Sequence, residues 1–212
     1  MDKLRVGVLI SGRGSNLEAL LNACSFSNFP AKIALVISNN ATAKGLLLAE
    51  KFGIPHLVID HLAFTERSNF DAKLDSVLQA AKIELVCLAG FMRLLTKNFV
   101  LTWKGRLLNI HPSLLPSFKG TNTHRQALDA GVKIHGCTVH FVTPELDSGP
   151  IIAQAAIRIS CTDNENDIAT RVLKIEHQLY PSALLMLATG RVKLDNDRVI
   201  IDNDIATNEI LF

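Results

Sequence analysis

An amide and an imidazole stand two residues apart at the end of an apolar run, at Asn109 and His111. Residues two apart in a β-strand point to the same face, so the two side chains are presented together. A carboxamide donor beside a titratable ring is suited to polarising a carbonyl group and moving a proton. Because Pro112 cannot continue a central strand, we expect the strand to end at about His111, at a sheet rim. The alternative is a capped strand end without chemistry.

An aspartate that could serve this pair, Asp147, lies in the connector TPELDSGP at residues 143–150. The connector is expected to return the chain towards the same sheet rim. An aspartate in such a turn is often only a turn former. The functional alternative is that Asp147 accepts a hydrogen bond from His111 and favours the imidazolium, which would stabilise a developing oxyanion.

The segment SGRGSN, residues 11–16, joins the first predicted strand to the first predicted helix. Backbone N–H groups and the helix dipole make such a junction an anion site. A dinucleotide fingerprint would need a third glycine where Leu17 stands, and the Walker motif is missing. We therefore expect a cradle for one phosphate monoester, built from the amides of Gly14, Ser15 and Asn16. The alternative is an ordinary N-capped turn.

A run of large apolar side chains, AGFMRLL, follows the fourth predicted strand at residues 89–95. These side chains could wall a pocket for a flat ring, and core packing is the alternative. The histidines, cysteines and acids show no zinc-site spacing, so no metal is predicted.

The elements that must position these residues alternate along the first half of the chain. Apolar runs at 4–10, 31–37, 56–59, 85–88 and 107–110 predict buried parallel strands. Helical patterns at 15–23, 43–52, 65–81 and 96–101 separate them. This alternation predicts an α/β fold with a doubly wound, mostly parallel twisted sheet.

The second half has a different pattern. A short helix at 123–130 precedes strands at 137–142 and 151–159, whose connector is too short for a helical crossover, so they are expected to be antiparallel. A helix at 163–188 follows, and residues 195–204 predict a small hairpin with 199–201 as its strand.

Length and composition favour one soluble domain over residues 1–212. The net charge of +2 comes without a basic stripe, which argues against nucleic acid as a partner. Four widely spaced cysteines without a CxxC pair fit buried thiols in a reducing compartment. The chain start lacks the pattern of a signal peptide or membrane span, so we expect a cytoplasmic protein that does not bind membranes.

Taken together, these motifs resemble the glycinamide ribonucleotide formyltransferases, a folate-dependent family of purine synthesis. The resemblance covers roughly nine tenths of the chain and is carried by VLISGxGSN at 8–16, LAGFMR at 88–93, LLNIHPSLLP at 107–116, GCTVHFV at 136–142, LDxGPII at 146–152 and EH at 176–177. It implies that the amine of 5-phosphoribosylglycinamide attacks the formyl carbon of 10-formyltetrahydrofolate. It also implies that this folate is a co-substrate, that no metal takes part, and that the protein is a monomer or weak homodimer.

The resemblance further implies residue roles. Asn109 would donate to the formyl oxygen, His111 would stabilise the oxyanion, and Asp147 would hold His111 and assist proton transfer. The phosphoribosyl substrate would be held by Gly14, Ser15, Asn16 and Glu176. The folate site would be formed by Arg67, Met92, Arg93, Leu94, Leu95, Asn109, Thr143, Pro144, Glu145, Leu146 and Asp147. Residues 1–105 would then form the phosphoribosyl-binding half, 106–190 the folate and catalytic half, and 191–212 a C-terminal hairpin and tail.

Other functions fit some of the same features. A formyltetrahydrofolate deformylase uses the same Asn, His and Asp, but it has no use for the phosphate cradle, and it is expected to carry a further N-terminal domain. Methionyl-tRNA formyltransferase is expected to carry a tRNA-binding domain and a basic surface. A non-catalytic protein that binds a phosphorylated sugar remains a third possibility.

Overall fold

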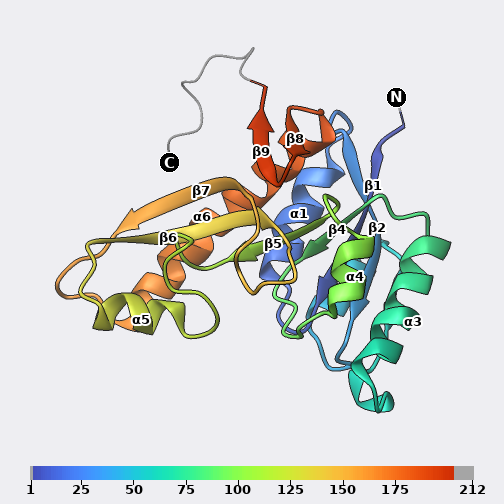
Figure 1. Ribbon diagram of the computed structural model, residues 1–212, viewed down its shortest axis with the longest axis horizontal. Coiled ribbons are helices and arrows are strands. Elements are labelled where there is room, and N and C mark those ends of the chain that lie inside the picture. Colours follow the sequence, from blue (N-terminus) through green and yellow to red (C-terminus); the bar gives the residue numbers. More distant parts are fainter. Residues whose placement is uncertain (1, 203–212) are drawn as a thin grey trace. The chain divides into compact units, whose positions relative to one another are not determined.

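The computed structural model describes residues 2–202, which form two compact units (Figure 1). The first unit extends to Asn109 and the second begins at Ile110, so the division falls inside one strand, β5 (Leu107–His111). Among the described residues the hydrogen-bonded strand order is β3-β2-β1-β4-β5-β6-β7, and a separate two-stranded sheet contains β8 and β9. The predicted α/β class with a mostly parallel sheet is confirmed.

Unit 1 is built on parallel strands rich in Val, Ile and Leu. Its strands are β1 (Leu4–Ile10), β2 (Ala31–Ser38), β3 (His56–Val58), β4 (Leu85–Leu88) and the first part of β5, and all the pairings from β3 to β5 are parallel. The last five residues of β1 and all four of β4 are buried, as expected of strands covered on both faces.

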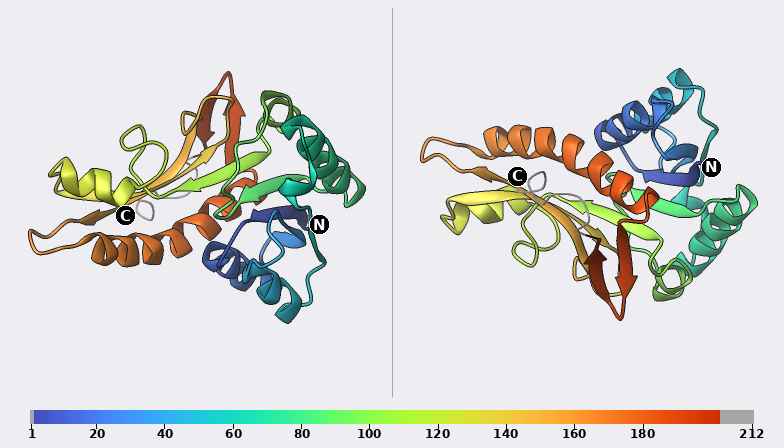
Figure 2. Two further views of the ribbon diagram at one scale, coloured as in Figure 1. Left: turned by 90° about the horizontal axis from the view of Figure 1, so that it is seen from below. Right: turned by 90° about the horizontal axis from the view of Figure 1, so that it is seen from above.

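Helices cover both faces of the unit 1 strands. They are α1 (Ser15–Ser25), α2 (Gly45–Lys51), α3 (Arg67–Ala80) and α4 (Lys97–Thr102), with a short 3₁₀ helix, η1 (His61–Ala63). Helices α1 and α2 lie on one side and α3 and α4 on the other, as both views in Figure 2 show. Trp103, the only tryptophan of the sequence, is fully buried and donates from Nε1 to Asp75 Oδ1 at 2.9 Å.

Unit 2 packs one long helix against two antiparallel strands. The strands are β6 (Ile134–Phe141) and β7 (Ile151–Arg158), and α6 (Glu165–Ala188) packs on both. Helix α5 (Thr123–Asp129) contacts α6, and β8 (Val192–Asp195) pairs with β9 (Arg198–Ile201) as a hairpin. The predicted antiparallel pair and the strand at 199–201 are confirmed. The hairpin begins at Val192 instead of Asp195, because β8 starts before the predicted range, and Asn203 and Asp204 lie outside the described residues.

The cysteine prediction is only partly confirmed. All four thiols are free, and Cys87 and Cys137 are buried, but Cys24 is only half-buried and Cys161 is exposed in the loop before α6. Cys161 follows β7, where the chain has already left the sheet. No helix in residues 2–202 is both long and apolar enough to cross a membrane.

Candidate functional site

The predicted phosphate loop lies at the carboxyl end of β1 in unit 1. Gly14 is the N-cap of α1 with φ +80°, and no side chain caps this helix. The N-cap is thus a glycine, and both the phosphate cradle and the ordinary N-capped turn stay predictions. First-turn N–H groups of an α-helix have no acceptor within the helix, so the start of α1, at Ser15 and Asn16, has the geometry of an anion site.

Close backbone contact fixes the shape of this loop. A Cβ on Gly14 would lie 2.6 Å from Cα of Gly45, the first residue of α2. The Gly45 amide donates to Gly12 O at 3.1 Å, which ties α2 to the loop. Only glycine combines a positive φ with this approach, so Gly14 is required by both conditions.

A second segment of unit 1, residues 89–96, is anchored to this loop and to α3. Ser11 donates its N–H to Gly90 O at 3.2 Å, and Ser11 Oγ accepts the Met92 N–H at 2.8 Å. At the other end, the buried Asp71 of α3 accepts the Thr96 N–H through Oδ2 at 2.6 Å. The segment is therefore held at both ends by polar contacts to its backbone.

The side chains of this segment are not part of the core. Met92 is 79% exposed and Leu94 57% exposed, whereas Leu95 is half-buried. Core packing is therefore excluded for Met92 and Leu94, which leaves an apolar surface able to meet a flat ring. The Arg93 guanidinium lies 4.7 Å from the centre of the Phe70 ring, a cation–π distance. Arg67, the first residue of α3, is exposed.

Strand β5 carries the pair formed by Asn109 and His111. Asn109, half-buried, is the last residue of unit 1, and His111, 4% exposed, is the last residue of the strand. Their spacing within one strand gives their side chains the same face of β5. The strand ends at His111, as Pro112 predicts.

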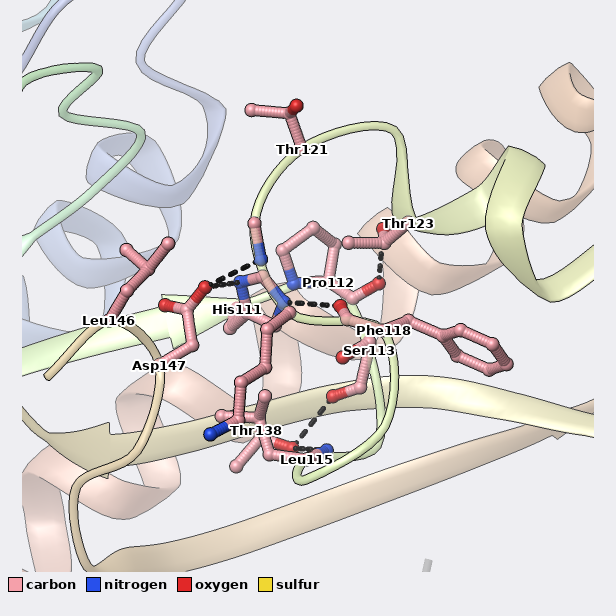
Figure 3. A network of polar contacts seen from close by, with 12 residues as sticks. His111, Pro112, Ser113, Leu115, Phe118, Thr121, Thr123, Thr138, Leu146 and Asp147 are labelled. Carbon is pink, nitrogen blue, oxygen red and sulfur yellow. Dashed lines mark hydrogen bonds and ion pairs between the residues drawn. The ribbon is translucent and has the colours of Figure 1, made fainter.

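The His111 ring in unit 2 is held at both nitrogens (Figure 3). Nε2 lies 2.9 Å from Phe118 O, and because a carbonyl oxygen only accepts, Nε2 carries a proton. Nδ1 lies 3.5 Å from Asp147 Oδ2, an ion-pair contact too long for a good hydrogen bond. The structure thus brings His111 and Asp147 together, while Phe118 O is an acceptor that the sequence could not reveal.

Asp147 is buried in a cluster of polar groups. Its side chain is 8% exposed, and Oδ2 also accepts the Gly120 N–H at 2.8 Å. Its backbone has φ +45°, and the next turn is tight because a Cβ on Gly149 would lie 1.8 Å from Phe141 O. Asp147 therefore joins the loop after β5 to the connector between β6 and β7.

His140 is a member of this cluster that the sequence reasoning missed. It is 2% exposed on β6, donates from Nδ1 to Phe141 O at 2.8 Å, and places Nε2 3.9 Å from Asp147 Oδ1. Burial lowers the pKa of His140, although the Phe141 carbonyl and the Asp147 charge oppose this. The sequence signal that could have identified His140 was its position in a buried strand, one residue before β6 ends at Phe141.

Two further histidines lie on the other side of the loop after β5. His124 Nδ1 and His135 Nε2 are 3.1 Å apart, and the Phe118 ring packs edge-on against His135. Burial, followed by the charge of His124, lowers the pKa of His135 to about 4. Burial likewise lowers the pKa of His124. Both rings are therefore neutral near pH 7.

The remaining predicted residues of unit 2 differ in burial. Pro144, Glu145 and Leu146 are exposed, whereas Thr143 is half-buried and donates from Oγ1 to Glu145 O at 3.2 Å. Glu176 on α6 is 6% exposed, and its charge, after burial, helps to raise the pKa of the Cys137 thiol on β6. Within residues 2–202 no group of three or more His, Cys, Asp or Glu is arranged to hold a metal ion.

A doubly wound sheet with a glycine-lined first turn and a buried imidazole–carboxylate pair defines an α/β enzyme. Residues 4–184 match the family model described as formyl transferase. The chain belongs to the formyl transferase family.

Named relatives support the same family. The phosphoribosylglycinamide formyltransferase of Escherichia coli (strain K12) is 44% identical over 94% of this chain and 94% of that protein. The trifunctional purine biosynthetic protein adenosine-3 of Gallus gallus is 50% identical over 91% of this chain, which spans only 19% of that protein. The crystal structure of glycinamide ribonucleotide transformylase 1 from Symbiobacterium toebii is similar with a TM-score of 0.91 and 47% identity, covering 94% of each chain.

Proposed function

We propose that this chain transfers the formyl group of 10-formyltetrahydrofolate to the amine of 5-phosphoribosylglycinamide, releasing tetrahydrofolate, in purine synthesis. The observation that carries the proposal is the His111 ring, buried at the end of β5 with Asp147 Oδ2 3.5 Å from Nδ1, two residues after Asn109. Whole-chain similarity to a protein named for this reaction supports it.

In the proposed reaction the substrate amine attacks the formyl carbon, which forms a new C–N bond and places negative charge on the formyl oxygen. Asn109 donates to that oxygen, and His111 stabilises the oxyanion. Because His111 Nε2 donates to Phe118 O in this structure, the oxyanion must replace that carbonyl as its acceptor. The bond from the formyl carbon to the folate nitrogen then breaks, and the proton lost by the amine passes to that nitrogen. Asp147 stabilises the protonated His111 and assists this transfer.

The substrates are proposed to bind through separate groups. Backbone amides of Gly14, Ser15 and Asn16 hold the phosphate, and Glu176 accepts from the ribose hydroxyls. The pteridine ring lies against the apolar surface of Met92, Leu94 and Leu95, while Arg67 and Arg93 supply positive charge to the folate. No metal is needed, because preorganised donors of this kind are worth about 10²- to 10³-fold in rate.

We propose that the protein works in the cytosol as a monomer or weak homodimer, with 10-formyltetrahydrofolate as a co-substrate. Neither nucleic acid nor membrane is proposed as a partner. The scattered charges of the sequence, with a net charge of +2, support this assignment.

The decisive experiment measures release of tetrahydrofolate from 10-formyltetrahydrofolate with and without 5-phosphoribosylglycinamide. Release that requires the amine supports the transferase. Equal release without it would identify a deformylase, and no release in either case would indicate a binding protein.

The phosphate cradle has a separate test. Glycinamide riboside, which lacks the phosphate, is expected to bind far more weakly than the phosphorylated substrate, because the amides at the start of α1 lose their anion. Equal affinities, measured by calorimetry, would remove the cradle from the proposal while leaving the transfer reaction intact.

A further inference from the structure

Unit 1 contains a pocket of about 330 Å³ that the proposed reaction does not use. It lies at the carboxyl ends of β1, β2 and β3, and its lining includes Ser11, Asn39, Asp60, His61, Leu62 and Met92. Of these, only Met92 belongs to the proposed folate site. In open α/β sheets the carboxyl rim of the strands is where ligands bind, and this volume is at the lower end for small-molecule sites.

The floor of the pocket is a buried carboxamide whose orientation is fixed. Ser11 Oγ accepts the Met92 N–H, so its own hydrogen is directed to Asn39 Oδ1 at 2.6 Å. That distance is typical of an O–H···O bond and short for N–H···O, which identifies this atom of Asn39 as the oxygen. Asn39 is 5% exposed and belongs to the pocket lining, and its Nδ2 group is directed at His61.

The amide hydrogens of Asn39 lack an acceptor among the described residues. Within residues 2–202 the one hydrogen-bond partner of Nδ2 is His61 Nδ1 at 3.3 Å, and His61 Nδ1 itself lies 2.9 Å from the Asn39 carbonyl oxygen. Because a carbonyl can only accept, His61 Nδ1 carries a proton and cannot also accept from Nδ2. A buried donor without an acceptor is destabilising, so the pocket favours a ligand that supplies one.

The other walls indicate which ligand fits. Leu62 is 81% exposed and Met92 79% exposed, which provides two apolar side chains for a ring. Asp60 uses Oδ1 to accept the Leu62 N–H at 2.9 Å, which leaves Oδ2 for ligand hydroxyls. A carboxylate at this rim is how α/β folds bind a ribose diol, and an asparagine pairs in a bidentate manner with the edge of adenine.

We propose that this pocket binds a ribonucleoside, with the base between Leu62 and Met92, its polar edge on the Asn39 carboxamide and its ribose diol on Asp60 Oδ2. Adenosine is the matching probe, because its base presents an acceptor beside a donor. The proposal depends only on unit 1 and shares Met92 alone with the proposed folate site.

The test is calorimetric titration of the whole protein with adenosine and with 2′-deoxyadenosine. Adenosine is expected to bind about tenfold more tightly than the deoxynucleoside, the equivalent of one hydrogen bond to a charged group. Asp60→Asn keeps the cap on the Leu62 amide, so it should fold, weaken adenosine about tenfold and abolish the preference for the diol.

A matched pair of variants tests the ring contact. Leu62→Asp should weaken adenosine about tenfold, because a charge replaces the apolar face. Leu47→Asp on α2, at a leucine that is also 67% exposed but outside the pocket lining, should leave binding unchanged.

Three outcomes would overturn the proposal. Absence of binding at millimolar adenosine would show that the pocket takes no nucleoside, and equal affinity for the deoxynucleoside would remove the role of Asp60. An equal loss of affinity in Leu62→Asp and Leu47→Asp would show that Leu62 does not contact the base.

Discussion

The two loops of unit 1 that are proposed to bind substrate, residues 11–16 and 89–96, and the histidine cluster of unit 2 are held by different kinds of contact. In unit 1 each contact that shapes residues 11–16 and 89–96 has a backbone N–H as its donor: Gly45 N–H to Gly12 O, Ser11 N–H to Gly90 O and Thr96 N–H to Asp71. In unit 2 the contacts are made by ionisable side chains, with His111 and His140 both directed at Asp147. Backbone geometry is suited to holding a substrate, and buried titratable groups are suited to moving charge.

The two regions also contain one buried carboxylate each that accepts a backbone N–H. Asp71 accepts from Thr96 at 2.6 Å, and Asp147 accepts from Gly120 at 2.8 Å. Of the two carboxylates, only Asp147 also lies beside imidazole rings, those of His111 and His140. We therefore expect Asp71 to position a loop in unit 1 and Asp147 to take part in catalysis in unit 2. Variants in each region should separate binding from turnover.

The largest effect is expected at the His111–Asp147 pair. His111→Ala and Asp147→Asn should each lower kcat by about 10²- to 10⁴-fold, because each removes a group that handles the charge or proton of the transition state. Steady-state release of tetrahydrofolate measures kcat, and circular dichroism checks the fold. His56→Ala, at an exposed ring on β3, is the control. Near-normal turnover in either pair variant would refute the catalytic role.

The next effect is expected at the phosphate loop. Gly14→Ala should raise KM for the phosphorylated amine at least about tenfold, because φ +80° and the contact with Gly45 force the loop to move. Gly12→Ala is the matched control, since a Cβ there meets nothing within 4 Å. Similar KM values for the two variants would show that the loop does not hold the phosphate.

A smaller effect is expected from the carboxylate of unit 1. Asp71→Ala removes the acceptor of the Thr96 N–H and should raise KM for the folate about tenfold, with kcat little changed. Asp71→Asn keeps an acceptor and should recover most of the affinity. A fall in kcat instead of a rise in KM would remove the distinction between the two carboxylates.

The smallest effect is expected on the pH dependence of the free energy of unfolding. The pKa of His135 is lowered in the fold to about 4, so the neutral ring is favoured by folding. Its contribution is complete above the ordinary histidine pKa of about 6.5 and is lost as pH falls from there through about 4. Urea unfolding at several pH values should show this loss, and His135→Gln should reduce its slope. If His135→Gln leaves this pH dependence unchanged, burial of His135 does not account for the loss of stability at low pH.

Sequence patterns predicted the parts of the site that depend on local residue type. Pro112 ends β5 after His111, and glycines at 12 and 14 mark the turn before α1, because both residues restrict the backbone in known ways. The exposure of Met92 and Leu94 could not be predicted, since an apolar run after a strand reads equally as core.

The contact between His111 and Asp147 was predicted from the sequence, but contacts to main-chain atoms were not. Phe118 O holds His111 through a carbonyl that every residue possesses, so no residue type marks it. The contact of His140 with Asp147 depends on a connector whose aspartate has φ +45°, a conformation that aspartate adopts only occasionally. The sequence therefore predicted the contact of His111 with Asp147, but not the contacts that Phe118 O and His140 add to it.

The burial of Trp103 in one compact unit and of Tyr180 in the other gives each unit its own spectroscopic reporter. The sequence has one tryptophan, in unit 1, and one tyrosine, Tyr180, in unit 2, and both are fully buried. Trp103 emission therefore follows the opening of unit 1 alone, whereas Tyr180 absorbance follows unit 2. A denaturation experiment on the unmodified protein can thus establish whether the two units unfold in one transition or two.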